Sequence, residues 1–365
     1  MDGRRLNPPI RFMLVTALCS LTMNITPSLS LAAKKSKAQT EQKEKKPKSW
    51  TNEFRREIAK IDQRTPGDLG IYVKRLGDGT EVNYQADRRW YLASTVKVLV
   101  AIALLQRQEQ GLVDLNKEIT LQKSDYVDGS GEVLWKEPGT KLTLGYLLEK
   151  MLTQSDSTAA DILIREIGVD EFNRQIQKSI AGNGFGKITT LLQVRYDAYG
   201  ELSPKAANLT NMDFIDFKKA KSPQDRLMLA ASRMQEDPVN LKSKSIDDAF
   251  EKYYKKGLNS GSLEAFGDVL EKLAKGQLLN EANTKLVMGY METMVTGENR
   301  IKAGLPDSVK FAQKTGTQIR RICNVGIMEP PSGPIVVTAC LEKFKDPAQA
   351  EKALASIGRA LAKTL

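Results

Sequence analysis

Three short motifs carry residue types that could act together in nucleophilic catalysis. They are Ser94-Thr95-Val96-Lys97, Ser155-Asp156-Ser157 and Lys314-Thr315-Gly316, in that order along the chain. A serine hydroxyl is a poor nucleophile until a neighbouring group takes its proton. The 365-residue chain contains no histidine, so a Ser-His-Asp triad is excluded. Lys97 stands one helical turn after Ser94 and can replace an imidazole if burial and a nearby cation lower the pKa of its ammonium group.

The elements expected to hold these motifs come from both ends of the chain. The apolar run from Val96 to Gln110 predicts a helix that begins beside Ser94 and ends at Gly111. Alternation and turn residues predict strands on both sides of a mainly helical stretch, which runs from Leu115 to about Tyr290. The predicted strands are 70–74, 81–84, 309–313, 323–328 and 335–341, and amphipathic helices are expected over 50–62 and 347–365. The two ends should therefore build one sheet, with a helical domain beside it and a ligand cleft at the seam.

The N-terminal 49 residues are predicted to contain a signal peptide followed by a linker. Three arginines, an apolar run from Phe12 to Leu21 and small residues at Ala32 and Ala33 predict a signal peptide over 1–33. The apolar run is too short for a membrane anchor, so we expect export to the periplasm or cell envelope without a stable membrane span. Residues 34–49 are lysine-rich and predict a disordered linker, although a polycation could also bind anionic wall polymer or lipid. These segments hold +7 of the formal +11 net charge, so composition does not indicate nucleic-acid binding.

The mature chain offers few ligands for a metal. It keeps Cys323 and Cys340, while Cys19 leaves with the signal peptide. An exported protein could join the two cysteines if they face each other on neighbouring strands, but spacing cannot show this, and we favour unpaired thiols. Zinc has almost no ligands here and no calcium-loop pattern is present, although oxygen-ligand metals are not excluded. We expect no metal and no cofactor.

The three motifs in this order resemble those of the penicillin-recognising serine hydrolases, and within them the class A β-lactamase-like group. The segment Leu92–Leu99 resembles that group's active-site helix, and Pro138-Gly139, Leu142–Leu144 and Ser155–Ala160 resemble its helical domain. Asp125–Gly131 resembles the segment before it. The resemblance covers about residues 67–200 and 258–343. It implies an α/β (α+β) fold of β-lactamase/transpeptidase type, in which an antiparallel sheet flanked by helices meets an all-helical domain at the active site.

The resemblance also implies a role for each motif. Ser94 would attack the carbonyl with Lys97 as its base, and Ser155 would pass a proton to the leaving nitrogen with help from Lys314. The backbone N–H groups of Ser94 and Thr317 would form the oxyanion hole. A substrate carboxylate would bind at Thr315 and Thr317 beside Gly316. Arg320 or Arg321 would add to that attraction.

Two departures from the family pattern bear on substrate and turnover. The second motif normally ends in asparagine, so Ser157 would hold a substrate amide less well or through water. The family's deacylating glutamate lies in a surface loop, and the matching stretch is Arg195–Glu201. Asp197 stands at the glutamate position, one methylene shorter, and Glu201 stands at the position of the family's asparagine. A carboxylate displaced by about 1 Å can cost about 10²-fold in rate.

The predicted organisation therefore has four parts and more than one possible function. The parts are the signal peptide, the linker, a catalytic domain over 50–345 and a C-terminal helix over 346–365 that packs on the sheet. Within the catalytic domain the sheet comes from 67–90 and 305–343, and the helical part spans 112–300. A lysine-rich insertion over 203–258 either folds over the cleft entrance or elaborates the surface, and we favour the latter. A monomeric enzyme that opens β-lactams is the first hypothesis. A D,D-peptidase acting on peptidoglycan stems is the second, and a catalytically silent wall-binding module is the third.

Overall fold

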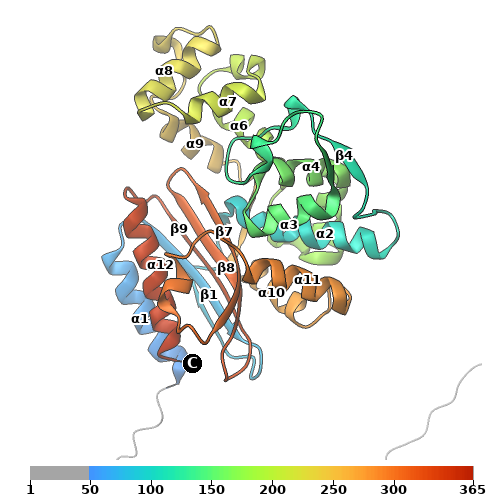
Figure 1. The fold of residues 1–365 in the computed structure, drawn as a ribbon. Helices are drawn as coiled ribbons and strands as arrows, with labels where there is room; N and C mark the ends of the chain where they lie inside the picture. Colours follow the sequence, from blue (N-terminus) through green and yellow to red (C-terminus); the bar gives the residue numbers. More distant parts are fainter. Residues whose placement is uncertain (1–48, 365) are drawn as a thin grey trace, which may run out of the picture. The chain divides into compact units, whose positions relative to one another are not determined.

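A five-stranded antiparallel sheet forms the centre of the structure, a computed structural model that describes residues 49–364 (Figure 1). The predicted signal peptide and all but the last residue of the predicted linker lie outside the described residues. The strand order is β2-β1-β9-β8-β7, so strands from the two ends of the chain pair directly. The strands of this sheet are β1 (Asp68–Arg75), β2 (Glu81–Tyr84), β7 (Lys310–Gln318), β8 (Arg321–Glu329) and β9 (Ile335–Glu342).

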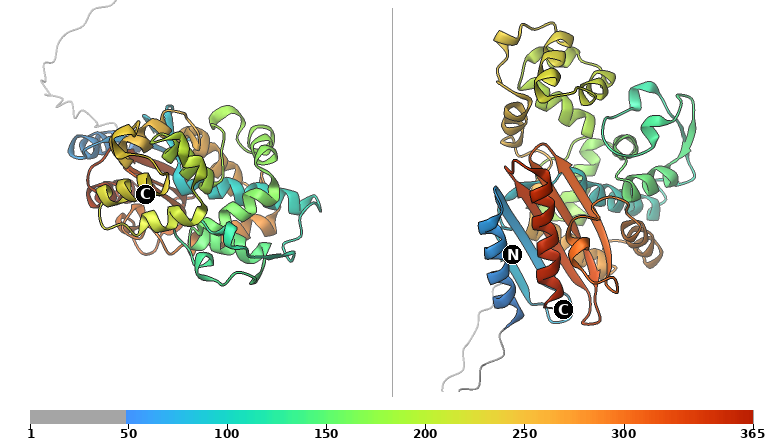
Figure 2. Two further views of the ribbon diagram at one scale, coloured as in Figure 1. Left: turned by 90° about the horizontal axis from the view of Figure 1, so that it is seen from above. Right: turned by 60° about the vertical axis from the view of Figure 1, so that its left-hand side comes forward.

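Helices cover both faces of this sheet, as its sequence requires. All eight residues of β9 are buried, and such a continuous apolar run belongs to a strand with no solvent-exposed face. Val337 faces a core shared with α1 (Trp50–Arg64) and α12 (Pro347–Ala362), while its neighbour Val336 faces the opposite core. The views in Figures 1 and 2 show α1 and α12 side by side on one face of the sheet. The predicted antiparallel sheet built from both chain ends is confirmed.

The middle of the chain is mainly helical. α2 is buried on all sides from Lys97 to Leu105, which identifies it as the central helix of this part. None of the helices within residues 49–364 is long and apolar enough to cross a membrane. The helices are α2 (Lys97–Glu109), α3 (Leu144–Thr153), α4 (Ser157–Ile167), α5 (Val169–Gln175), α6 (Leu191–Gly200), α7 (Asn211–Lys218), α8 (Pro223–Arg233), α9 (Ile246–Tyr254), α10 (Leu263–Ala274) and α11 (Glu281–Glu292). Short strands β3 (Arg89–Tyr91) and β6 (Ser260–Ser262) pair with each other, as do β4 (Glu118–Thr120) and β5 (Lys141–Thr143).

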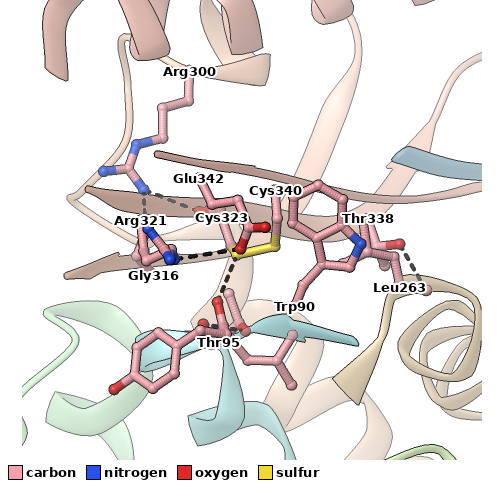
Figure 3. The surroundings of a disulfide bond; sticks show 12 residues. Trp90, Thr95, Leu263, Arg300, Gly316, Arg321, Cys323, Thr338, Cys340 and Glu342 are labelled. Atoms are coloured by element: carbon pink, nitrogen blue, oxygen red, sulfur yellow. Dashed lines mark hydrogen bonds and ion pairs between the residues drawn. A yellow bond between two sulfur atoms is a disulfide. The ribbon is translucent and has the colours of Figure 1, made fainter. Parts of the chain in front are cut away.

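The two mature cysteines form a disulfide, contrary to our expectation of free thiols. Cys323 on β8 and Cys340 on β9 are direct partners in the strand register, and their Cα atoms lie 4.1 Å apart. Strand spacing in the sequence could not give this register, which depends on how β8 and β9 align. Figure 3 shows Trp90 and Gly316 close to the buried bridge. The bridge therefore joins β9 to β8, the strand that pairs with β7.

We expect the double replacement Cys323→Ala with Cys340→Ala to lower the free energy of unfolding by about 3 kcal/mol. The bridge closes a loop with a sequence separation of 17 residues, and a loop near this length restricts the unfolded chain by about that amount. Guanidinium chloride titrations of both proteins measure the difference. Thiol titration of the denatured, unreduced protein is the control, and reactive Cys323 and Cys340 thiols would contradict the bridge.

Candidate active site

A cavity of about 380 Å³ brings the three sequence motifs together. Ser94, Ser155, Ser157, Thr315 and Thr317 all line it. They come from the start of the α2 helical segment, the turn between α3 and α4, and strand β7. These elements are separated by roughly 60 and 160 positions in the sequence, and only the fold places them around one space. The cavity thus holds the candidate nucleophile together with the other two motifs.

Ser94 lies in a strained turn that is packed tightly against β7. It belongs to a short 3₁₀ helix, η1 (Ala93–Val96), which runs directly into α2. Ala93 has φ of +48°, a left-handed conformation that costs a non-glycine residue about 1–3 kcal/mol and is concentrated at functional sites. A Cβ on Gly316 would lie 2.5 Å from the carbonyl oxygen of Leu92 and 3.2 Å from the backbone nitrogen of Ser94. Only glycine permits β7 to approach the nucleophile this closely.

Lys97 is completely buried one turn after Ser94. Its Nζ donates to the carbonyl oxygen of Ser155 at 2.5 Å and lies 3.3 Å from Ser155 Oγ. Burial lowers the pKa of Lys97 to about 7, although Asp156 and Asp161 favour its charged form. A neutral amine can therefore exist at this position near physiological pH. In the free protein this amine is hydrogen-bonded to Ser155 and not to Ser94. A catalytic hydrogen bond to a nucleophile often tightens only when substrate is bound.

Lys314 completes the polar group around Ser155. Its Nζ donates to Ser155 Oγ at 2.8 Å and to the carbonyl oxygen of Thr315 at 3.1 Å. Burial, with the charges of Lys97 and Arg300, holds the pKa of Lys314 well below its usual range. β7 extends four residues beyond Lys314, so this lysine lies within the strand, whereas the strand predicted over 309–313 ended just before it. Ser155 Oγ therefore has an amine on each side, one from each of the other motifs.

The turn that carries Ser155 is fixed by backbone and side-chain contacts. Ser155 has φ of +57°, a second left-handed non-glycine residue at this cavity. Asp156 is buried and caps α4 by accepting from the Ala159 amide at 2.9 Å, and it also accepts from the Val133 amide at 2.8 Å. Ser130 donates its hydroxyl to the Ser155 carbonyl at 2.7 Å and lines the cavity. Ser157 is buried in the adjacent wall.

The wall formed by β7 holds a buried arginine that the sequence did not reveal. Arg300 precedes the 3₁₀ helix η8 (Ile301–Gly304) and donates to Thr317 Oγ1 at 2.7 Å. It also donates to the carbonyl oxygens of Gly316 and Cys323 at 3.1 and 3.0 Å. Its position depends on η8, which packs against α12 and is bonded to Asn324 of β8 through the Ile301 amide, and no motif or spacing in the sequence marks it.

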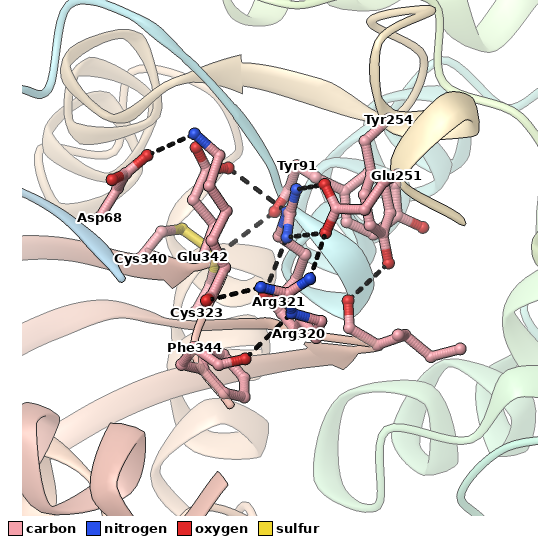
Figure 4. Close-up of polar contacts among 12 residues, drawn as sticks. Asp68, Tyr91, Glu251, Tyr254, Arg320, Arg321, Cys323, Cys340, Glu342 and Phe344 are labelled. Carbon is pink, nitrogen blue, oxygen red and sulfur yellow. Dashed lines mark hydrogen bonds and ion pairs between the residues drawn. A yellow bond between two sulfur atoms is a disulfide. The ribbon is translucent and has the colours of Figure 1, made fainter. Parts of the chain in front are cut away.

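Arg320 does not line the cavity, which corrects its predicted place in the carboxylate site. It lies in the β7–β8 turn with φ of +52°, and its guanidinium donates to the carbonyl oxygens of Phe344 and Lys343 at 3.2 and 2.9 Å (Figure 4). Arg321 is likewise turned away and forms a two-point ion pair with Glu251. The turn geometry directs both arginines to the end of the sheet, whereas Arg300 reaches Thr317 from the segment before η8.

The two carboxylates considered for deacylation also lie outside the cavity lining. The stretch expected as a loop is helix α6, because Thr190 caps it and the Asp161 carboxylate accepts from the Leu191 and Leu192 amides at 2.6 and 2.8 Å. Asp197 accepts from Gln193 Nε2 at 2.8 Å. Glu201 pairs with Lys256 at 2.5 Å. The face of α6 that lines the cavity carries Val194 and Arg195, whereas Asp197 and Glu201 are not among the lining residues.

The cavity is strongly cationic. Among the described residues that line it, Asp128 is the one acidic residue, and Arg195 neutralises it through an ion pair of 2.6 Å. Arg300, Lys218 and Arg226 also line the cavity. Lys218 and Arg226 come from the 203–258 insertion, so this segment contributes to the site and is not a surface elaboration. The site consequently favours an anionic ligand.

No group of three or more histidine, cysteine, aspartate or glutamate side chains in residues 49–364 could hold a metal ion. Hydroxyls and guanidinium groups line this cavity, and the amines of Lys97 and Lys314 lie beside Ser155. Such a set suits attack on a carbonyl next to a carboxylate.

The sheet, the helical part and the cavity between them define a β-lactamase/transpeptidase fold. The family model described as the "Beta-lactamase enzyme family" matches residues 53–365, and the chain belongs to this family. A β-lactamase of Bacillus licheniformis is 24% identical over 321 residues, which cover 87% of this chain and 86% of the relative.

Solved structures agree with this fold. A β-lactamase from Xanthomonas campestris pv. campestris superposes with a TM-score of 0.65 at 21% identity, covering 86% of this chain and 98% of that one. The structure of PBP-A superposes with a TM-score of 0.61 at 20% identity, covering 86% and 95%. At this identity the two superpositions establish the fold alone.

Proposed function

We propose that the protein is an exported serine acyl-transfer hydrolase of class A β-lactamase type that opens β-lactam rings through an acyl-Ser94 intermediate. Ser94 Oγ bonds to the carbonyl carbon as the carbon–nitrogen bond breaks. The hydroxyl proton passes to Lys97, and Ser155 delivers a proton to the leaving nitrogen. The amides of Ser94 and Thr317 stabilise the oxyanion, since Ser94 lies at the start of a helical turn and Thr317 on the edge strand β7. The product is an ester of Ser94, which water must then hydrolyse.

One observation carries this proposal. Lys97 Nζ and Lys314 Nζ approach the same hydroxyl, Ser155 Oγ, at 3.3 and 2.8 Å, and Ser94 lines the same cavity. Two buried amines with lowered pKa values lie beside the Ser155 hydroxyl, and Lys97 follows Ser94 by one helical turn, so proton transfer here needs no histidine. Arg300 and Thr317 supply a place for the substrate carboxylate. The family supports a β-lactam as the substrate class.

A second function is favoured by the absence of a free carboxylate in the cavity lining of the described chain. Asp128 is paired with Arg195, while Asp197 is bonded to Gln193 outside the lining. Without a carboxylate to activate water, the acyl-enzyme formed from a lactam would persist. This behaviour suits a D-Ala-D-Ala carboxypeptidase or transpeptidase acting on peptidoglycan stems. Acylation of Ser94 is common to both functions, and export places either one in the cell envelope.

The lifetime of a fluorescent penicillin adduct distinguishes these functions. Rapid loss of the label identifies a lactamase, and a persistent label identifies a peptidase. Absence of label on the folded protein contradicts both proposals.

We expect Asp197→Asn to change the adduct lifetime by less than about twofold, because its carboxylate lies outside the cavity lining. Gel fluorescence after removal of free label measures the lifetime. Gln193→Ala, which frees Asp197 from its hydrogen bond, is the matched control. A lifetime increase of about tenfold or more in Asp197→Asn would show that this carboxylate activates the deacylating water.

A further inference from the structure

The insertion is firmly attached to the end of the sheet that carries β7. Its helices α7, α8 and α9 enclose an apolar core that includes Phe217 and Phe250, together with Tyr199 of α6. Glu251 of α9 accepts from both terminal nitrogens of Arg321 at 2.9 and 2.8 Å. The Arg321 guanidinium also lies 4.3 Å from the ring centroid of Tyr254, as Figure 4 shows beside the ion pair. These partly buried contacts hold the insertion in a defined position relative to the cavity.

The insertion presents two cations to the cavity. Lys218, the last residue of α7, donates to the carbonyl oxygen of Gly129 at 3.0 Å. Arg226 of α8 donates to Tyr199 Oη at 2.6 Å, with its guanidinium 5.6 Å from the Tyr199 ring centroid. Both side chains line the cavity. Neither has a carboxylate within 4.0 Å in residues 49–364, whereas Arg195 in the same wall is paired with Asp128.

These cations lie on a different wall from the carboxylate site on β7. Lys218 is bonded to the loop that covers Ser157, since a Cβ on Gly129 would lie 2.2 Å from Ser157 Oγ. Thr315, Thr317 and Arg300 form the wall on and behind β7. Ser157 is the residue that would face the acyl side chain of a substrate held at Ser94. The cavity therefore has one cationic wall beside the substrate carboxylate and a second one beside its acyl side chain.

We propose that Lys218 and Arg226 form a second anion subsite, which selects acyl donors with an additional carboxylate on the acyl side chain. This inference rests on the proposed function of Ser94. One carboxylate of the substrate binds at Thr315, Thr317 and Arg300. The second carboxylate binds the Lys218 ammonium and the Arg226 guanidinium. Hydrogen bonds to Gly129 and Tyr199 position these two cations. Substrates of this site are therefore dianions.

Carbenicillin and benzylpenicillin test this selection because they differ by one carboxylate on the side-chain carbon. The measured quantity is the ratio of their second-order acylation rate constants, obtained by competition with the fluorescent penicillin. We expect the wild-type ratio to favour carbenicillin and to fall as ionic strength rises. In Lys218→Met with Arg226→Met the ratio should fall about 10- to 100-fold, the loss typical of hydrogen bonds to a charged group. Each single variant should lose part of this preference.

Lys219→Met and Arg233→Met are the matched controls. Lys219 is the exposed neighbour of Lys218 and pairs with Asp216 at 3.0 Å, and Arg233 lies on α8 near Asp213 and Asp216. Neither lines the cavity, so both variants should keep the wild-type ratio. An unchanged ratio in the folded double variant would overturn the subsite. An equal loss for both penicillins would also overturn it, because that result indicates a structural role.

Calorimetry on Ser94→Ala separates the subsite from the proposed chemistry. Non-covalent binding of the two penicillins can be compared in this background with and without Lys218→Met and Arg226→Met. A preference for carbenicillin that disappears with the two cations supports the subsite even if Ser94 is not acylated. Equal affinities in all backgrounds would contradict it, whatever the labelling experiments show.

Discussion

Ser94→Ala should abolish covalent labelling by penicillin and lower kcat for lactam hydrolysis by about 10⁶-fold, as the loss of a serine nucleophile does elsewhere. Ser94 lines the cavity from η1, which runs into α2. The first residue of α2 is Lys97, the candidate base. Ser130, Ser155 and Ser157 also line the cavity, so alternative nucleophiles are present in the same space. Mass spectrometry of the intact protein after incubation with penicillin measures the adduct directly.

Ser179→Ala is the control for this experiment. Ser179 is exposed, donates a hydrogen bond to Gln106 Oε1 and does not line the cavity, so its variant should label like the wild type. A labelled Ser94→Ala protein would assign the nucleophile to another residue. Peptide mapping of the adduct would then identify which of the cavity serines was acylated.

The acylation rate should rise with pH and level off above about pH 7. Only the neutral amine of Lys97 can accept the Ser94 proton, and burial lowers the pKa of Lys97 to about 7. About half of the amine is neutral at pH 7 and about 1% at pH 5, so the rate should fall about 50-fold between these pH values. Lys97→Met should lower acylation by about 10²- to 10⁴-fold and remove this pH dependence. Stopped-flow measurement of adduct formation gives both results.

The same pKa shift predicts a pH dependence of stability with a defined sign. Lys97 in the unfolded chain keeps its proton up to about pH 10.4, whereas the folded protein releases it above about pH 7. Between these values the unfolded state binds more protons, so the Lys97 contribution to the free energy of unfolding increases with pH. Lys97→Met should show a smaller increase in urea titrations at pH 7 and pH 9, because the lowered pKa of Lys314 still contributes. Identical pH profiles for the two proteins would contradict a buried, neutral Lys97.

The sequence determined the parts of this protein that depend on local pattern. Helical and strand periodicity along the chain predicted α1, α2, α12 and the strands from both ends, because side-chain spacing directly reports secondary structure. Because the chain has no histidine, the lysine one turn after Ser94 was the leading candidate for the proton acceptor on residue types alone. The order of the three motifs indicated which elements would meet, and the structure brings them together at one cavity.

Only the tertiary structure decided the features that depend on how distant segments align. The register of β8 and β9 placed Cys323 opposite Cys340 and formed the disulfide. The packing of η8 brought Arg300 to Thr317, while the β7–β8 turn directed Arg320 away. The attachment of α9 to Arg321 set the insertion beside the cavity, where it supplies Lys218. Strand register, turn conformation and packing between segments are set by contacts across the whole fold, so residue spacing in one segment cannot determine them.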